Sequence, residues 1–415
     1  MTTQTDTTSP SRRQVLRGLA VSTGAGAALG AGAGPASTII PGLATPASAA
    51  APPGRVVVVF LRGGIDGLSA VVPYTEPAYY TARPGISIPA GSVTDLDGQY
   101  GLHPAMAPLH GLYTQGRLAV INSVGNPAMS RSHFEAQAYW EQGAAGNSPM
   151  GFGWIARHLL SSTGIPDAQF RAIGLGANTV RSLVGYQEAL VMASVDQFSL
   201  GANDWLASTL QTPLTMLYSG QAPVEATGTT TVQALDDLAA LISGGGGPPV
   251  YNNSTQAFND ARTLLGAGLG TEIITINVGG WDTHDNMGDE TAGEMYDLLD
   301  GLATNLTMFQ AGLDADGHSD VTTILMSEFG RRVHENGSGG CDHGFGNVVV
   351  AMGAGIAGNQ VLGSWPGLTS LVNGDLDVTT DFRDVLAEIV ADRLGNTDFA
   401  SVFPGHTVTP VGLTL

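Results

Sequence analysis

Four short runs of apolar and β-branched residues recur along the chain. Their apolar positions are continuous and do not alternate with polar ones, which is typical of strands covered on both faces of a sheet. The runs are RVVVVFL (55–61), RLAVINSV (117–124), EIITINVGG (272–280) and DVTTILMS (320–327). We therefore predict four buried strands in these segments.

Segments with the apolar spacing of helices lie between and after these runs, at 133–143, 254–268, 290–313 and 381–395. Strands that alternate with helices predict a mainly parallel central sheet in a three-layer α/β/α sandwich. We expect residues 50–415 to form a single α/β domain of this kind. Residues 175–250 have no clear periodicity, and we expect an insertion or a cap over the sheet there.

The first fifty residues follow a different pattern. Adjacent Arg12 and Arg13 precede a long, weakly apolar stretch rich in Gly and Ala, and Ala47-Ser48-Ala49 offers a small-residue cleavage site. This order predicts a cleaved twin-arginine signal peptide over residues 1–49. An N-terminal membrane anchor is the alternative, but the glycines make the stretch poorly hydrophobic. We therefore expect the twin-arginine translocase to export the protein to the periplasm or outside the cell.

Charge narrows the classes of partner. The chain has a formal net charge of −20 and no Lys; loss of residues 1–49 removes three Arg and one Asp and gives −22. Nucleic acids and anionic membranes bind basic patches, so we expect neither nucleic-acid binding nor stable membrane insertion. An anionic substrate would need a local positive centre, which metal ions or a few arginines can supply.

Polar residues follow each of the four predicted strands. Ligands gather beyond the carboxyl ends of parallel strands, so these side chains are expected to lie at one edge of the sheet. In strand order they are Asp66, then Ser132 and His133, then Asp282 and His284, then Glu328, Asp342 and His343. Carboxylates and imidazoles together are the ligands of transition metals.

Several of these residues also have an ordinary structural explanation. Asp66, in GGIDG, fits a turn in which its carboxylate caps the backbone. Asp282 and His284 fit a capped turn with a solvated imidazole. Ser132 fits the N-cap of a helix, although a helix N-terminus also attracts phosphate or sulfate groups. These alternatives stay open at the level of sequence.

Six segments, taken in order, resemble the exported bacterial family known as domain of unknown function 1501. The resemblance covers about residues 55–404 and extends to the alkaline phosphatase and sulfatase superfamily, so it implies an alkaline-phosphatase-like fold. The segments are RGGIDGLSAVVPY, HPAMAPLHGLY, RSHFEAQAYWEQG, GGWDTH, SEFGRR and DHGFGN.

The resemblance implies two metal positions and a serine nucleophile. One metal would be bound by Asp66, Asp342 and His343. The other would be bound by Asp282 and His284, which are closer in sequence than is usual in relatives, with His406 as the available third ligand. Ser132 matches the nucleophile, and Ser130 is its rival.

Four further residues belong to the expected site. His133 is a candidate contributor to the second metal position or to catalysis, and Glu328 either ligates a metal or supports a ligand. Arg62 and Arg131 are candidates to hold substrate oxygens, unless each pairs with a carboxylate.

The expected function is an exported hydrolase of phosphate or sulfate esters, using a serine nucleophile and one or two divalent ions (Zn, Mn, Fe or Ca). Its substrate would be an anionic ester, either a small molecule or a polymer. The alternative is a catalytically degenerate binding or assembly protein for an extracellular polymer. A Ser-His-Asp esterase is a third option, but RSHF is not the G-x-S-x-G motif and Asp342-His343 would have no role in it.

Overall fold

The computed structural model describes residues 54–146, 151–165, 168, 170–176, 180–196, 213–218, 228, 231–232 and 254–415. All four predicted strands are present, as β1 (Arg55–Leu61), β5 (Leu118–Gly125), β8 (Ile273–Val278) and β9 (Val321–Met326). So are the four predicted helices, as α5 (His133–Gln142), α9 (Ser254–Gly266), α10 (Glu294–Ala315) and α11 (Phe382–Asp392).

The central sheet of the described residues has the order β11-β5-β10-β9-β1-β8-β6-β7, and β12 also pairs with β5. Its strands pair in parallel except β10, which is antiparallel to both β5 and β9. The strands beyond the predicted four are β6 (Ala172–Leu175), β7 (Leu190–Met192), β10 (Asn347–Gly353), β11 (Gln360–Leu362) and β12 (Thr380–Asp381). The expected mainly parallel α/β class is therefore confirmed.

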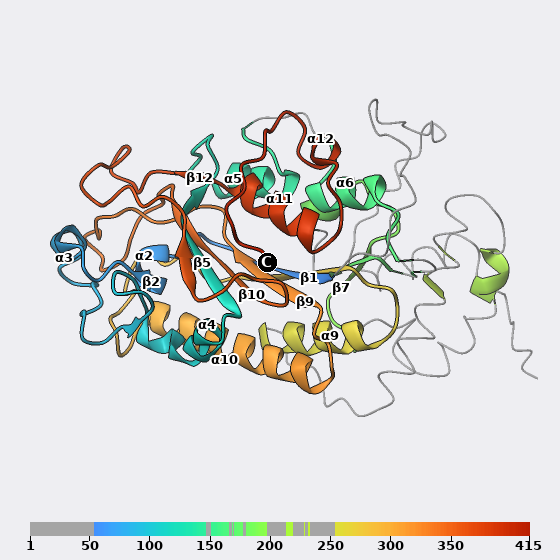
Figure 1. The fold of residues 1–415 in the computed structure, drawn as a ribbon, viewed down its shortest axis with the longest axis horizontal. Helices are drawn as coiled ribbons and strands as arrows, with labels where there is room; N and C mark the ends of the chain where they lie inside the picture. The colour runs from blue at the N-terminus through green and yellow to red at the C-terminus, as the bar shows by residue number, and fades with distance from the viewer. Residues whose placement is uncertain are drawn as a thin grey trace, which may run out of the picture.

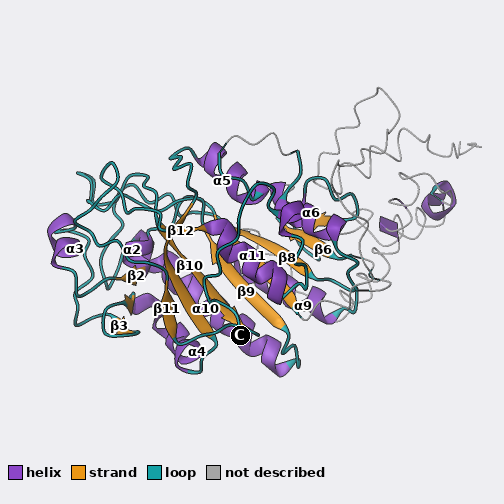
Figure 2. Ribbon diagram, turned by 45° about the horizontal axis from the view of Figure 1, so that its top comes forward, coloured by secondary structure: helices purple, strands orange, loops and turns teal. Residues whose placement is uncertain are grey.

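Helices cover both faces of this sheet (Figures 1 and 2). Alternate residues of β1 point to opposite faces, as in any strand. Val57 and Val59 belong to the core that includes residues of α9 and α10, whereas Val56 and Val58 belong to the core that includes residues of α11. The continuous apolar run of β1 thus contributes to two cores at once.

Shorter elements complete the described part of the chain. A small antiparallel sheet consists of β2 (Val71–Val72), β3 (Thr94–Asp95) and β4 (Gly101–Leu102). The remaining helices are α2 (Gly67–Ala70), α3 (Pro77–Ala82), η1 (Pro104–Leu109), α4 (His110–Thr114), α6 (Trp154–Ser161), η2 (Arg181–Leu183) and α12 (Phe399–Val402). No helix in the described ranges is long and apolar enough to cross a membrane.

The predicted domain boundaries are only partly covered. The expected signal peptide, residues 1–49, lies outside the described residues, as does most of the expected insertion at 175–250. Within that segment, β7 pairs in parallel with β6 at the edge of the central sheet. Residues 190–192 therefore extend the sheet and do not cap it.

Candidate metal centre

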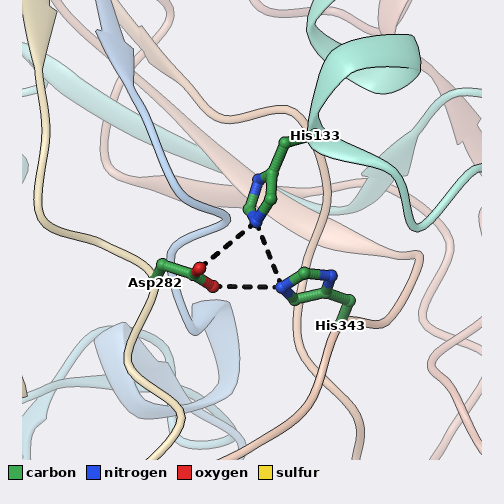
Figure 3. Close-up of side chains that lie close together, drawn as sticks. All are labelled: His133, Asp282 and His343. Atoms are coloured by element: carbon green, nitrogen blue, oxygen red, sulfur yellow. Dashed lines mark hydrogen bonds and ion pairs between the residues drawn. The ribbon is translucent and has the colours of Figure 1, made fainter.

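Three side chains from distant parts of the sequence meet at one point (Figure 3). His133 is the first residue of α5, Asp282 follows β8, and His343 precedes β10. The Nε2 atoms of His133 and His343 are 3.1 Å apart. The Asp282 carboxylate lies 3.0 Å from Nε2 of His343 and 3.4 Å from Nε2 of His133. Among the described residues, His133, Asp282 and His343 form the one group of at least three side chains that could hold a metal ion.

His284 extends the group. Its Nε2 atom lies 3.0 Å from Nε2 of His343 and 3.0 Å from Oδ1 of Asp282. The side chains of Asp282 and His284 are 48% and 40% exposed, so solvent and a substrate can reach this side of the group.

Hydrogen bonds at Nδ1 fix the proton on each imidazole. Nδ1 of His343 lies 2.9 Å from the carbonyl oxygen of Arg131, which can only accept, so this nitrogen carries the proton. Nδ1 of His133 lies 2.8 Å from Oε1 of Glu328, and Nδ1 of His284 lies 3.3 Å from Oδ1 of Asp342. Both partners accept when ionised, so both nitrogens donate. In the neutral state all three rings therefore present an unprotonated Nε2.

This arrangement needs a positive charge at its centre. Three nitrogen lone pairs and a carboxylate face one another within about hydrogen-bond distance, and no ring proton lies between them when the rings are neutral. Arg331 reaches one side of the group, with Nη1 3.4 Å from Nε2 of His284, and leaves the other lone pairs without a donor. A bound cation satisfies all of them, and imidazole with carboxylate is a donor set for zinc, manganese or iron. Calcium prefers an all-oxygen shell, so the imidazoles favour the other three ions, and the identity of the metal stays a prediction.

Glu328 holds His133 from behind. Its side chain is buried, and Oε1 also accepts from the backbone N–H of Gly63 at 2.9 Å and from Nε2 of Gln137 at 2.7 Å. Burial alone would raise the pKa of Glu328, but hydrogen bonds from His133 and Gln137 lower it below its ordinary value. Glu328 is therefore an ionised carboxylate that orients a ligand, one of the two roles predicted for it.

Arg331 holds Asp282 in the same way. This buried guanidinium donates to Oδ1 of Asp282 at 2.7 Å and to the carbonyl oxygens of Gly64, Trp281 and Cys341. Burial would raise the pKa of Asp282, but the hydrogen bond and charge of Arg331 outweigh it and lower the pKa to about 2. Asp282 is thus negatively charged throughout the ordinary pH range.

Two of the three imidazoles, those of His133 and His343, have opposite pKa shifts. The Glu328 carboxylate raises the pKa of His133, while burial lowers the pKa of His343.

Two predicted ligands have other partners. Asp342, expected to bind a metal beside His343, contacts Nδ1 of His284 and accepts from Asn336, so it supports a ligand. Asp66 caps α2 and pairs with Arg83 at 2.6 Å, with both side chains fully buried. Asp66 thus lies in a buried ion pair and Asp342 contacts the group only through His284, so neither belongs to the three-residue group, and their assignment as direct ligands stays a prediction.

His406 and Arg62 are also held elsewhere. Nε2 of His406 lies 2.6 Å from Asp384 of α11, which places this residue in a C-terminal contact and not in the metal group. Arg62 donates to both carboxylate oxygens of Glu141, at 3.1 and 2.9 Å, and reaches Gln137 at 3.2 Å. It therefore holds Gln137 and Glu141 of α5, which is the ion-pair alternative left open for Arg62.

The predicted nucleophile lies next to a ligand. Ser132 precedes His133 at the N-cap of α5, and its hydroxyl makes no hydrogen bond to the described residues. Its rival Ser130 donates to Glu135 at 2.7 Å. Ser132 therefore has the free hydroxyl, whereas that of Ser130 is engaged.

Sequence reasoning missed Gln137 and Arg331 as supports of the group. Gln137 lies one helical turn after His133, at i+4, so the helix pattern itself could have indicated that both face the same way. Arg331 carried no such signal, because its contacts are with segments distant in sequence. Cys341 is buried and its pKa is raised to about 12 by burial, so it is a neutral thiol and not a nucleophile.

Comparison with known proteins finds one family model that matches the C-terminal part of the chain. Residues 252–414 match the family model described as "Protein of unknown function (DUF1501)". The family resemblance seen in the motifs is confirmed over this range, which contains GGWDTH, SEFGRR and DHGFGN; the earlier motifs lie outside it. No curated protein matches this sequence.

Solved structures to which this chain is similar include a sulfatase, a periplasmic domain in complex with Zn and an alkaline phosphatase. The PsFucS1 sulfatase from Pseudoalteromonas sp. is 11% identical, with 87% of this chain and 73% of that one covered and a TM-score of 0.35. The C-terminal periplasmic domain of EcEptC from Escherichia coli, in complex with Zn, is 11% identical (86% and 88% covered, TM-score 0.39). The alkaline phosphatase from the Antarctic bacterium TAB5 is 10% identical (84% and 100% covered, TM-score 0.33). These likenesses are too distant to assign an activity or a residue role to this chain.

Proposed function

We propose that this protein, whose residues 252–414 match the DUF1501 model, is a metal-dependent hydrolase of phosphate or sulfate esters. One observation carries the proposal: three unprotonated Nε2 atoms and one carboxylate converge at a site that solvent can reach. Such a group binds a divalent transition metal and leaves room for a further ligand from solution. When bound, the metal would neutralise an anionic ester oxygen and lower the pKa of an attacking hydroxyl or water.

The chain's own groups provide the rest of the chemistry. Glu328 and Asp342 keep His133 and His284 in the tautomers that leave Nε2 free, and Arg331 keeps Asp282 ionised. Helix α5 begins at this site, and its N-terminus favours an anionic group.

Ser132 is the proposed nucleophile. It is covalently next to the ligand His133, and its hydroxyl is free of contacts with the described residues. Attack by this oxygen on the phosphorus or sulfur atom would form a covalent ester and release the alcohol, and water would then free the enzyme.

Export is part of the proposal. The twin-arginine pattern of residues 1–49 supports transport of the folded protein to the periplasm or the cell exterior. The substrate would then be an extracytoplasmic anionic ester, and the net charge of −20 supports a need for metal to attract it.

The test combines a metal count with turnover. Purified protein is expected to hold about one zinc, manganese or iron ion per chain and to hydrolyse at least one class among aryl phosphates, phosphodiesters and aryl sulfates. Ser132→Ala should lower kcat by about 100-fold or more, and Ser130→Ala should leave it near wild type. Asp282→Asn should lower both metal content and turnover. Bound metal with no turnover above the Ser132→Ala background would exclude the hydrolase.

One observation favours a second candidate. The described residues bring together one metal group, where the family resemblance implied two positions. A protein that retains the fold and one metal but binds an extracellular polymer without cleaving it would have this arrangement. In that case the metal-loaded protein would bind an anionic polysaccharide, and the polysaccharide would remain uncleaved after prolonged incubation with the protein.

A further inference from the structure

Two arginines beside the metal group share a single carboxylate. Arg131 donates to Asp375 through Nε at 2.9 Å and through Nη2. Arg332 lies on the same carboxylate, with Nε 3.7 Å from Oδ1. Asp375 is fully buried, whereas the two arginine side chains are 33% and 40% exposed. Both guanidiniums are therefore partly exposed to solvent while they share the buried Asp375 carboxylate.

The Arg332 guanidinium is short of partners. The distance of 3.7 Å to Asp375 is too long for a hydrogen bond, and Oδ1 of Asp375 is a buried acceptor without one. Its side chain donates no hydrogen bond to any other described residue. A guanidinium carries five N–H donors that suit phosphate, sulfate and carboxylate groups. Arg332 therefore lies at ion-pair distance from Asp375 with its hydrogen-bond donors available.

Both arginines flank the ligand His343. The carbonyl oxygen of Arg131 accepts from Nδ1 of His343, and the backbone N–H of Arg332 donates to the carbonyl oxygen of Asp342 at 2.8 Å. Arg331, next to Arg332, pairs in a β-bridge with His343. The backbone of each arginine is thus hydrogen-bonded to Asp342 or His343.

Arg131 and Arg332 give the surroundings of the metal group an excess of positive charge. Three carboxylates and one guanidinium contact or support the metal group: Asp282, Glu328, Asp342 and Arg331. A divalent ion would bring that set to neutrality. Arg131 and Arg332 with Asp375 add one net positive charge at its edge, on a protein of net charge −20.

We infer that Arg332 and Arg131 form a second anion subsite, so that the preferred substrate is an ester with a second anionic group near the scissile one. A multiply sulfated or phosphorylated molecule has this chemistry, whereas a simple monoester would occupy the metal group alone. The inference rests on the proposed function for the identity of the reacting group. Its test measures binding and requires no turnover.

The test compares two probes that cannot be hydrolysed. Benzenesulfonate and benzene-1,3-disulfonate share one ring and differ in a second anionic group. Calorimetric titration of the metal-loaded protein should show the disulfonate binding about tenfold or more tightly, since charge-assisted hydrogen bonds to a guanidinium are strong. In Arg332→Gln this ratio should fall severalfold, and in the Arg131→Gln/Arg332→Gln double variant it should approach one, with metal content unchanged.

Arg117→Gln is the matched control. Arg117 precedes β5, at the end of that strand opposite to Arg131, and its 32% exposed side chain pairs with Asp314. The variant removes the same charge and should keep the wild-type probe ratio. Equal affinity of the two probes for wild-type protein, or an unchanged ratio in Arg332→Gln, would overturn the subsite. If wild-type protein bound neither metal nor benzenesulfonate, the proposed function would instead be overturned. The failure of the subsite and the failure of the proposed function therefore give different results.

Discussion

At the scale of single residues, the proton on each imidazole decides what the group can bind. His133, His284 and His343 each give Nδ1–H to an oxygen held by another segment, so each presents Nε2 inward. A one-atom change at any of these acceptors would release a ring to rotate or change tautomer. The strongest acceptor is Glu328, because it is buried and ionised.

Glu328→Gln tests this support. The amide keeps the shape but removes the negative charge that stabilises the metal-bound imidazole of His133. We expect metal affinity to fall about 10–100-fold, as is usual for a partner behind a histidine ligand. Competition titration with a chromogenic chelator measures it. Glu335→Gln is the control, since Glu335 accepts backbone N–H groups of Gly85 and Ile86 instead; equal losses in both variants would contradict the role of Glu328.

Gly340→Ala tests how closely the glycine-rich loop approaches the site. A Cβ atom at residue 340 would lie 2.3 Å from the carbonyl carbon and oxygen of His284, a clash with backbone that cannot move easily. We expect lower thermal stability and weaker metal binding, because the clash displaces a ligand. Gly337→Ala in the same loop meets nothing within 4 Å and should resemble wild type. If both variants bind metal normally, the close approach has no function.

At the scale of elements, parallel strands gather different chemistry at their two ends. The carboxyl ends of β1, β8 and β9 lead into Gly63, Asp282 and Glu328, which take part in the site. The amino ends carry structural pairs instead. Arg171 precedes β6 and Glu272 precedes the adjacent β8, and they form a buried ion pair at 2.6 Å.

Glu272→Gln tests the amino-end pair through pH. Burial would raise the pKa of Glu272, but the nearby His158 ring, 3.8 Å away, and the hydrogen bonds and charge of Arg171 lower it from 4.5 to about 2. Because the folded-state pKa is depressed, this stabilisation is fully present above pH ~4.5 and is lost as pH falls toward 2. We expect wild type to be more stable than the variant by on the order of 3 kcal/mol at pH 7.

That difference should shrink as the pH falls from about 4.5 toward 2, as urea denaturation at several pH values will show. A stability difference that stays constant over this range would mean that the charge of Glu272 does not matter.

At the scale of the whole molecule, the metal group ties together segments that are far apart in sequence. His133 and His343 are 210 residues apart, and Asp282 lies between them. An ion bound by all of them stabilises the folded state only, because the unfolded chain does not hold the ligands together.

Removal of metal is therefore expected to lower Tm. At a free metal concentration of 100 Kd the stabilisation is about 2.7 kcal/mol, which corresponds to roughly 3–4 °C for a domain of this size. Differential scanning calorimetry with and without a chelator measures the shift. His406→Gln should lower the overall Tm by breaking its contact with Asp384, yet keep the same chelator-dependent shift. A loss of that shift in His406→Gln would return His406 to the metal site.

Local patterns in the sequence were enough for the elements and for the identity of the site segments. Buried strands and their helices follow from continuous apolar runs and helical spacing, which act over a few residues. The same patterns indicated that Asp282, His284 and His343 lie at strand ends, and all three are in the group. Strand β10, whose Val-rich run resembles the parallel strands, was not predicted, and its antiparallel direction depends on its return past β9.

Only the tertiary structure decided which of these polar residues meet. Sequence determined that acids and imidazoles collect at one edge of the sheet, since strand ends and turns are local features. It could not distinguish His133 as a member of the metal group from Asp66, which lies beside Arg83, because the partner of a carboxylate depends on packing between segments many residues apart. For the same reason Asp342 and Glu328 emerged as supports for ligands, and Arg332 as a cation with donors to spare.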